Sequence, residues 1–183
     1  MEADPRERTR AWLLLLVPVA VLAVLLAVLR NGGEPAARHP APRPLASPAG
    51  AAGTVGGLLP DATLRGRVEE QPARSLRPGV VMLVAPGCRC VSAVRQVVAE
   101  AARYRLVTYL VESGESLRQV EVLAAQAGGD VGPFADPAGA LAAAYGLRTA
   151  AALVLVRGDG VVTQVVGAVG PSLRLGTALR ALV

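Results

Sequence analysis

The residues of this chain best suited to chemistry are its two cysteines, Cys88 and Cys90, with one arginine between them. They lie in the stretch VMLVAPGCRCVSAVRQVV, where a continuous apolar run gives way to apolar positions at helical spacing. A cysteine pair this close can be a redox couple, a structural bridge, part of a soft-metal site or the relic of an active site. The strands and helices expected around the two cysteines help to choose among these possibilities.

Strand and helix patterns alternate from Gly57 to Val183, in an order that predicts an α/β fold. The expected strands are 62–68, 80–85, 105–112, a short one from 131, and a hairpin of 151–156 and 161–167 around an Asp-Gly turn. Four helices are expected: one from Val91, one over 115–128, one that ends at Gly146, and a terminal one with Pro171 near its first turn. Strands joined by helices predict a central mixed sheet of about five strands with helices on both faces.

The N-terminus predicts one membrane anchor. Residues 11–29, AWLLLLVPVAVLAVLLAVL, form an uncharged apolar run about as long as a bilayer core is thick, with Trp12 at its start. The run is longer than the apolar part of a cleaved signal peptide, and no small-residue cleavage site follows it. A helix in the core of a soluble domain is also disfavoured, because the run has no polar face. Arginines packed before the run favour a cytoplasmic N-terminus (1–10) and a C-terminal domain outside the membrane, where disulfides persist.

Residues 30–56 are rich in proline, alanine and glycine and are expected to be a semi-stiff linker ahead of a domain at 57–183. His39, the single histidine of the chain, lies in this linker and is interpreted as a linker residue rather than a ligand. The net charge of +5 is spread along the chain without a basic run, and aromatic residues make up only 3%. These features argue against nucleic-acid binding.

Several strings resemble the thioredoxin-like superfamily, in particular its membrane-tethered extracytoplasmic members. VVMLVAPGC is similar to the family's central strand and the turn that presents its nucleophilic cysteine. FADPAGALAAAYGLRTAAALVLVRGDGVV is similar to its Asp-Pro turn, helix and final hairpin, and VGAVGPSLRLGTALRAL to its closing helix. The resemblance covers nearly all of residues 57–183 and implies a thioredoxin-like fold.

The resemblance also implies roles for the cysteines. Cys88 matches the family's attacking cysteine and is expected in the first turn of the helix that follows strand 80–85. There the helix dipole and Arg89 would lower its pKa, and the thiolate is the form that attacks a disulfide. Cys90 comes one residue earlier than the second cysteine of a Cys-x-x-Cys motif. Residues i and i+2 of a helix do not face each other, so a bridge would distort that turn.

Other departures from the family concern the surroundings of the cysteines. Gly87 stands where a tryptophan is common, Ala150 or Ala151 where the family has a cis-proline, and Met82 where it has a buried acid. The sequence therefore reveals no acid–base helper. Ala85 replaces the threonine of a peroxiredoxin, and the domain has neither the histidine of a copper-delivering member nor the roughly four ligands of a zinc site.

These observations favour a membrane-anchored extracytoplasmic thiol-disulfide oxidoreductase that acts on protein disulfides through Cys88 and Cys90, without cofactor or metal. The alternative is a redox-inactive thioredoxin-fold module that binds a partner protein, with the Cys88–Cys90 pair as a relic or a local bridge. Soft-metal binding stays open as a third possibility. The substrate, the electron partner and the direction of transfer do not follow from the sequence.

The apolar run at 11–29 yields a testable topology. A reporter that is active only outside the cytoplasm should be active when fused after Gly57, because the domain should follow the anchor across the membrane. Paired fusions of a reporter active only in the cytoplasm serve as the control. Cytoplasmic activity at that position would overturn both the location and the argument that a disulfide persists there.

Overall fold

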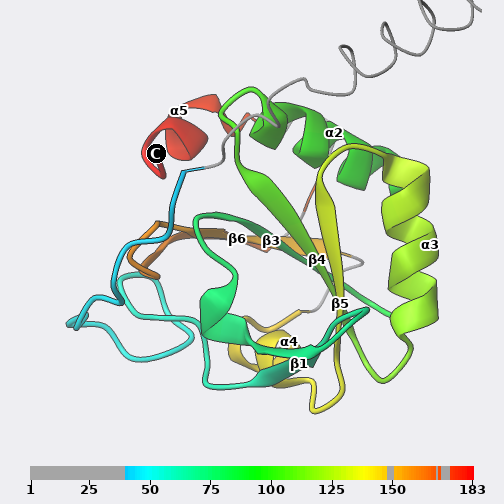
Figure 1. The fold of residues 1–183 in the computed structure, drawn as a ribbon, viewed down its shortest axis with the longest axis horizontal. Coiled ribbons are helices and arrows are strands. Elements are labelled where there is room, and N and C mark those ends of the chain that lie inside the picture. The colour runs from blue at the N-terminus through cyan, green and yellow to red at the C-terminus, as the bar shows by residue number, and fades with distance from the viewer. Residues whose placement is uncertain (1–39, 148–150, 168, 170–173) are drawn as a thin grey trace, which may run out of the picture. The chain divides into compact units, whose positions relative to one another are not determined.

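A seven-stranded mixed sheet organises the chain, in the spatial order β2-β1-β5-β4-β3-β6-β7 (Figure 1). The computed structural model describes residues 40–147, 151–167, 169 and 174–183. The anchor expected at 11–29 lies outside these residues, and among those described no helix has the length and apolarity to cross a membrane. A compact unit comprises His39–Val183.

The sheet combines a parallel centre with antiparallel edges. Strands β3, β4 and β5 run parallel, β6 and β7 continue the sheet antiparallel to β3, and a β1–β2 hairpin joins β5 on the other side. Crossover helices connect the parallel strands, as such pairs require. The strands are β1 (Thr63–Arg65), β2 (Glu70–Pro72), β3 (Gly79–Val84), β4 (Val107–Ser113), β5 (Val131–Asp136), β6 (Ala151–Val156) and β7 (Val162–Val166).

Helices cover both faces of the sheet, as the sequence predicts. One face packs against the longer helices and the C-terminal one, and the other against the short helix that follows β5 (Figure 1). The helices are η1 (Ala73–Ser75), α2 (Val91–Ala102), α3 (Leu117–Ala127), α4 (Ala140–Ala144) and α5 (Gly176–Arg180).

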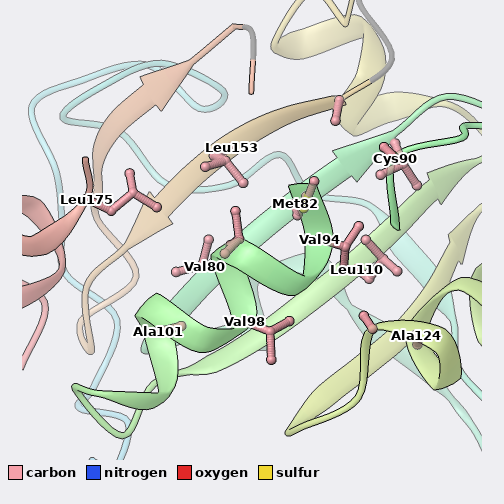
Figure 2. Close-up of a cluster of buried hydrophobic side chains, with 14 of the residues drawn as sticks. Val80, Met82, Cys90, Val94, Val98, Ala101, Leu110, Ala124, Leu153 and Leu175 are labelled. Carbon is pink, nitrogen blue, oxygen red and sulfur yellow. The ribbon is translucent and has the colours of Figure 1, made fainter. Parts of the chain in front are cut away.

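Strand β3 divides its side chains between the two resulting cores. Val80, Met82 and Val84 join the core under α2, α3 and α5, whereas Val81 and Leu83 join the one on the α4 face. All six residues of the strand are buried. The continuous apolar run of the sequence is explained by this arrangement, because a strand that is covered on both faces needs apolar side chains on both. Figure 2 shows the larger core around Val80, Met82 and α2.

The α/β class and the mixed sheet are confirmed, but some elements differ from the prediction. The strand expected at 62–68 is shorter and covers Thr63–Arg65. Strand β2 was not predicted, because its exposed residues Glu70 and Pro72 do not show a strand pattern. The sheet thus has seven strands instead of about five. The terminal helix is shorter than expected: it covers Gly176–Arg180, and the residues before it, Arg174 and Leu175, are described but not helical.

Residues 40–57, which we name the strap, are hydrogen-bonded to the turn between β6 and β7. The amides of Arg43 and Ala46 donate to the carbonyls of Gly158 and Asp159, at 2.8 and 2.9 Å. Further along, the amide of Gly56 donates to the carbonyl of Val162 at 2.8 Å. Much of the segment expected as a linker is therefore held by the domain (Figure 1, blue to cyan).

The side chain of Arg77 fastens the strap to its neighbours. Its Nη1 donates to the carbonyls of Arg43 and, at 2.7 Å, of Gly158, while Nε donates to the carbonyl of Arg74 at 3.0 Å. One guanidinium thus links the strap, the β6–β7 turn and η1. Such a planar group with several donors suits this bridging role.

Replacing Arg77 by methionine should destabilise the domain by about 1–3 kcal/mol, because hydrogen bonds from a charged donor to three carbonyls are lost. Urea unfolding of the 39–183 unit would measure the change, and proteolysis within the strap should become faster. Arg65→Met removes an exposed arginine on β1 and serves as the control. Equal stability of the two variants would show that Arg77 does not hold the strap.

Candidate functional site

A tight turn ends β3 and sets the start of the cysteine loop. The amide of Cys88 donates to the carbonyl of Ala85 at 3.1 Å, with Pro86 and Gly87 between them. Gly87 has φ +69°, a conformation that glycine adopts at little cost, and Pro-Gly is a favoured centre for this kind of turn. The apolar strand therefore stops at Val84, and Cys88 lies at the carboxyl edge of the sheet.

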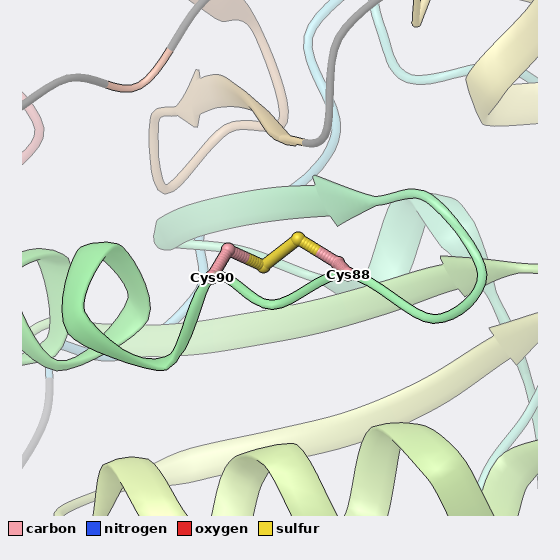
Figure 3. The surroundings of a disulfide bond; sticks show 2 residues. All are labelled: Cys88 and Cys90. Atoms are coloured by element: carbon pink, nitrogen blue, oxygen red, sulfur yellow. A yellow bond between two sulfur atoms is a disulfide. The ribbon is translucent and has the colours of Figure 1, made fainter.

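Cys88 and Cys90 are joined by a disulfide, with an S–S distance of 2.00 Å and a Cα–Cα distance of 5.3 Å (Figure 3). The expectation that Cys88 lies in the first turn of the helix is wrong, because α2 begins at Val91. Cys90 is its N-cap, with φ −106° and ψ 23°, and its carbonyl accepts from the amide of Val94 at 2.9 Å. Both cysteines precede the helix, so the bond spans non-helical backbone and leaves the first turn of α2 intact.

The two sulfur-bearing residues differ in accessibility. Cys90 is only 9% exposed and belongs to the core cluster that contains Met82 and Val94 (Figure 2). Cys88 is half-buried at the border of that core, and Arg89 between them is exposed. An incoming disulfide can therefore reach Cys88 more readily than Cys90.

A buried carboxyl lies at the same edge of the sheet. Glu112 occupies the end of β4 opposite Val84 and is 4% exposed. Because side chains alternate along a strand, Glu112 lies on the same sheet face as Leu110, the face that α2 and α3 cover. Burial raises the pKa of Glu112 above its ordinary value of 4.5, since a charged carboxylate loses hydration there.

Cys88 and Glu112 line one pocket of about 320 Å³. Its other walls come from the turn after β3 and from the first half of α3, and they are mostly apolar: Ala85, Gly87, Arg118, Gln119, Val122 and Leu123. The volume is near the lower limit of small-molecule sites, roughly 300–1,000 Å³. The half-buried cysteine thus faces a recess that also holds an acid.

Glu112 is a candidate site residue that was not identified from the sequence. Met82, the position that the resemblance aligns with a buried acid, is fully buried in the core, and the neighbouring strand supplies a carboxyl instead. A signal was present, because the carboxyl ends of adjacent parallel strands meet at one edge of a sheet. Glu112 is the last residue of the strand expected at 105–112, and Cys88 follows the strand expected at 80–85, so the meeting of the two at that edge could have been inferred.

The remaining site expectations concern proline and metal. Ala151 is the first residue of β6, opposite Val84, and Ala150 lies outside the described residues. Within the described part of the chain, no group of three or more His, Cys, Asp or Glu residues is placed to hold a metal ion.

The raised pKa of Glu112 predicts a pH-dependent stability. The folded state binds the proton of this carboxyl more tightly than the unfolded state, so the stabilising contribution is complete below about pH 4.5 and is lost as the pH rises through the folded-state pKa. Glu112→Gln should therefore gain stability relative to the parent chain between pH 4 and pH 8.

Urea unfolding of both proteins across this range would measure the difference. Glu115→Gln, at an exposed position in the loop after β4, controls for the loss of one negative charge. A stability difference between parent and Glu112→Gln that stays constant with pH would contradict the proposed burial effect.

Comparison with known proteins finds solved structures of similar fold. No protein-family model matches the chain, and no curated protein does. Among solved structures, a secreted Mycobacterium tuberculosis disulfide oxidoreductase homologous to E. coli DsbE is 17% identical, with a TM-score of 0.53 over 67% of this chain and 96% of its own. MTB DsbF is 19% identical, with a TM-score of 0.54 over the same shares of the two chains, 67% and 96%.

A thioredoxin-like protein from Porphyromonas gingivalis is also similar, with 17% identity and a TM-score of 0.50 over 68% of this chain and 90% of its own. At such identities the likeness concerns the fold. The order of the strands, the position of the cysteine loop after the central strand and these similarities agree: the chain has a thioredoxin-like fold.

Proposed function

We propose that the protein is a thiol-disulfide oxidoreductase in which Cys88 is the attacking cysteine and Cys90 the resolving one. The observation that carries the proposal is the disulfide between a half-buried Cys88 and a buried Cys90 at the carboxyl edge of β3. The similar Mycobacterium tuberculosis structure is described as a disulfide oxidoreductase, which supports the same chemistry here.

In the reducing direction, the Cys88 thiolate attacks one sulfur of a substrate disulfide and releases the other as a thiolate. The Cys90 thiolate then attacks Sγ of Cys88 in the mixed disulfide. That step releases the second substrate thiolate and forms the Cys88–Cys90 disulfide. The substrate gains two electrons and the protein loses two, and the reverse sequence would oxidise a substrate dithiol.

Electrostatics at the loop support Cys88 as the attacking group. Arg89 is adjacent in sequence and exposed, and the N-terminus of α2 begins three residues after Cys88. Positive charge and free backbone amides both favour a thiolate over a thiol. Glu112 lines the same pocket as Cys88 and, with its pKa raised by burial, suits exchange of a proton with a sulfur atom.

The proposed place of action is the outer side of a membrane, with residues 11–29 as a single anchor and the N-terminus in the cytoplasm. The length and apolarity of that run support this part of the proposal. An oxidising compartment would allow the Cys88–Cys90 bond to persist between turnovers. Protein disulfides are the proposed substrates.

The pKa of Cys88 in the reduced protein provides the first test. Alkylation rates measured against pH should show a midpoint well below 8.5, the value of an unperturbed cysteine, and the fast reaction should be absent in Cys88→Ser. Cys90 should react more slowly because it is buried. In parallel, Cys90→Ser should accumulate a mixed disulfide with a substrate protein, since no thiol remains to resolve it.

Cys88→Ser is the matched control for trapping, because it keeps Cys90 but removes the attacking sulfur. A normal midpoint for Cys88 together with no trapped protein would refute the oxidoreductase and favour the redox-inactive binding module.

A further inference from the structure

Two unpaired opposite charges share the pocket beside Cys88. Within the described residues, the side chains of Glu112 and Arg118 form no hydrogen bond and no ion pair, either with each other or with a neighbour. The oxygens of Glu112 are not among the fully buried side-chain atoms that lack a partner, so they are accessible from the pocket. A ligand in the pocket can therefore supply the hydrogen-bond donors that the neighbouring side chains do not.

The two charges occupy different depths of the pocket. Glu112 is almost fully buried at the end of β4, whereas Arg118 is exposed on the second residue of α3. Apolar side chains, including Val122 and Leu123, complete the walls. A fitting ligand is therefore small, places a cation toward Glu112 and an anion toward Arg118, and carries sulfur within reach of Cys88.

We propose that this pocket binds the amino-acid part of a small zwitterionic disulfide, with cystine as the simplest example. The α-ammonium would donate to the carboxylate of Glu112, the α-carboxylate would accept from Arg118, and the side-chain sulfur would meet Cys88. A protein side chain would bring one charge at most, whereas a free amino acid brings both. This inference rests on the proposed function of Cys88 and adds a class of small substrates to it.

The reaction balances with the protein as the reductant. The thiolate of reduced Cys88 attacks one sulfur of cystine and forms a Cys88–cysteine mixed disulfide, releasing one cysteine thiolate. The Cys90 thiolate attacks Sγ of Cys88 and releases the second cysteine thiolate. One cystine is thereby reduced to two cysteines, and the Cys88–Cys90 dithiol is oxidised to the disulfide.

Chirality provides the sharpest test, because L-cystine and D-cystine have the same intrinsic reactivity. The full-length chain, purified in a mild detergent, is reduced with dithiothreitol, freed of it, and mixed with a disulfide in a single turnover. The probes are L-cystine, D-cystine, cystamine, which is only cationic, and the neutral bis(2-hydroxyethyl) disulfide. Three contacts around one carbon, at Glu112, Arg118 and Cys88, should make the two cystine enantiomers react at different rates.

Two variants test which residue contacts the ammonium group of the ligand and which contacts its carboxylate. Rates are divided by the rate for the neutral disulfide, so a change in the reactivity of Cys88 itself cancels. Glu112→Gln should lower the relative rates of L-cystine and cystamine about tenfold, the size of one charge-assisted contact. Arg118→Gln should lower the relative rate of L-cystine alone. Glu115→Gln and Arg180→Gln change exposed residues outside the pocket and should leave the ratios unaltered.

Equal rates for the two cystine enantiomers, or equal losses for charged and neutral disulfides in both variants, would overturn the proposal. A separate binding measurement distinguishes its failure from failure of the redox function. S-methyl-L-cysteine carries both charges but cannot react, and in NMR titration of the oxidised chain it should shift resonances of α3. If no disulfide is reduced, the proposed function fails, and the presence or absence of this binding still decides whether the pocket takes an amino acid.

Discussion

Burial of β3 on both faces of the sheet is the constraint on which the candidate site depends. Its six residues are all buried, and both of its edges are paired, with β4 on one side and β6 on the other. Each of its six residues pairs with a residue of β4 on one side and of β6 on the other, so the ladders along both edges hold the strand in one register. The point where it ends, Val84, is therefore fixed, and the turn through Pro86 and Gly87 delivers Cys88 from that point.

The same burial gives the two cysteines unequal surroundings. Cys90 contributes to the core under α2, and Cys88 borders it and faces a pocket. Because α2 packs against the sheet through Val94, Val97 and Val98, its first residue and the N-cap before it have little freedom to move. The resolving thiol would thus stay close to Cys88 when the bond between them opens, which favours the intramolecular step over escape of a mixed disulfide.

Sequence alone predicted the elements whose patterns depend on local periodicity or on a continuous apolar run. The strands expected at 80–85 and 151–156 and the helix from Val91 match the structure within about one residue. The hairpin partner β2 could not be recognised, because three exposed or half-exposed residues with a proline carry no strand pattern.

Candidate-site details followed from the sequence only in part. Both cysteines were identified, but their place ahead of the helix depends on where α2 begins, and helix boundaries are less determined by sequence than helix existence. Glu112 becomes part of the site only through the pairing of β4 with β3, a non-local contact. The strap escaped prediction because its hydrogen bonds use backbone groups, to which proline- and alanine-rich composition gives no guide.

The strap is held at a point of the sheet far from the cysteine loop. It binds beside the β6–β7 turn, and Val156, just before that turn, pairs with Gly79 at the start of β3, the end of the strand farthest from Cys88. Any pull on the chain from its N-terminal side is therefore applied at the end of the sheet remote from the disulfide. If residues 11–29 anchor the protein as proposed, only residues 30–42 separate the anchor from the first hydrogen bond of the strap, at Arg43, and fully extended they cover at most about 47 Å. The held strap and the cysteine loop therefore belong to opposite ends of β3, so a load on the N-terminal segment would reach the sheet without acting on the loop directly.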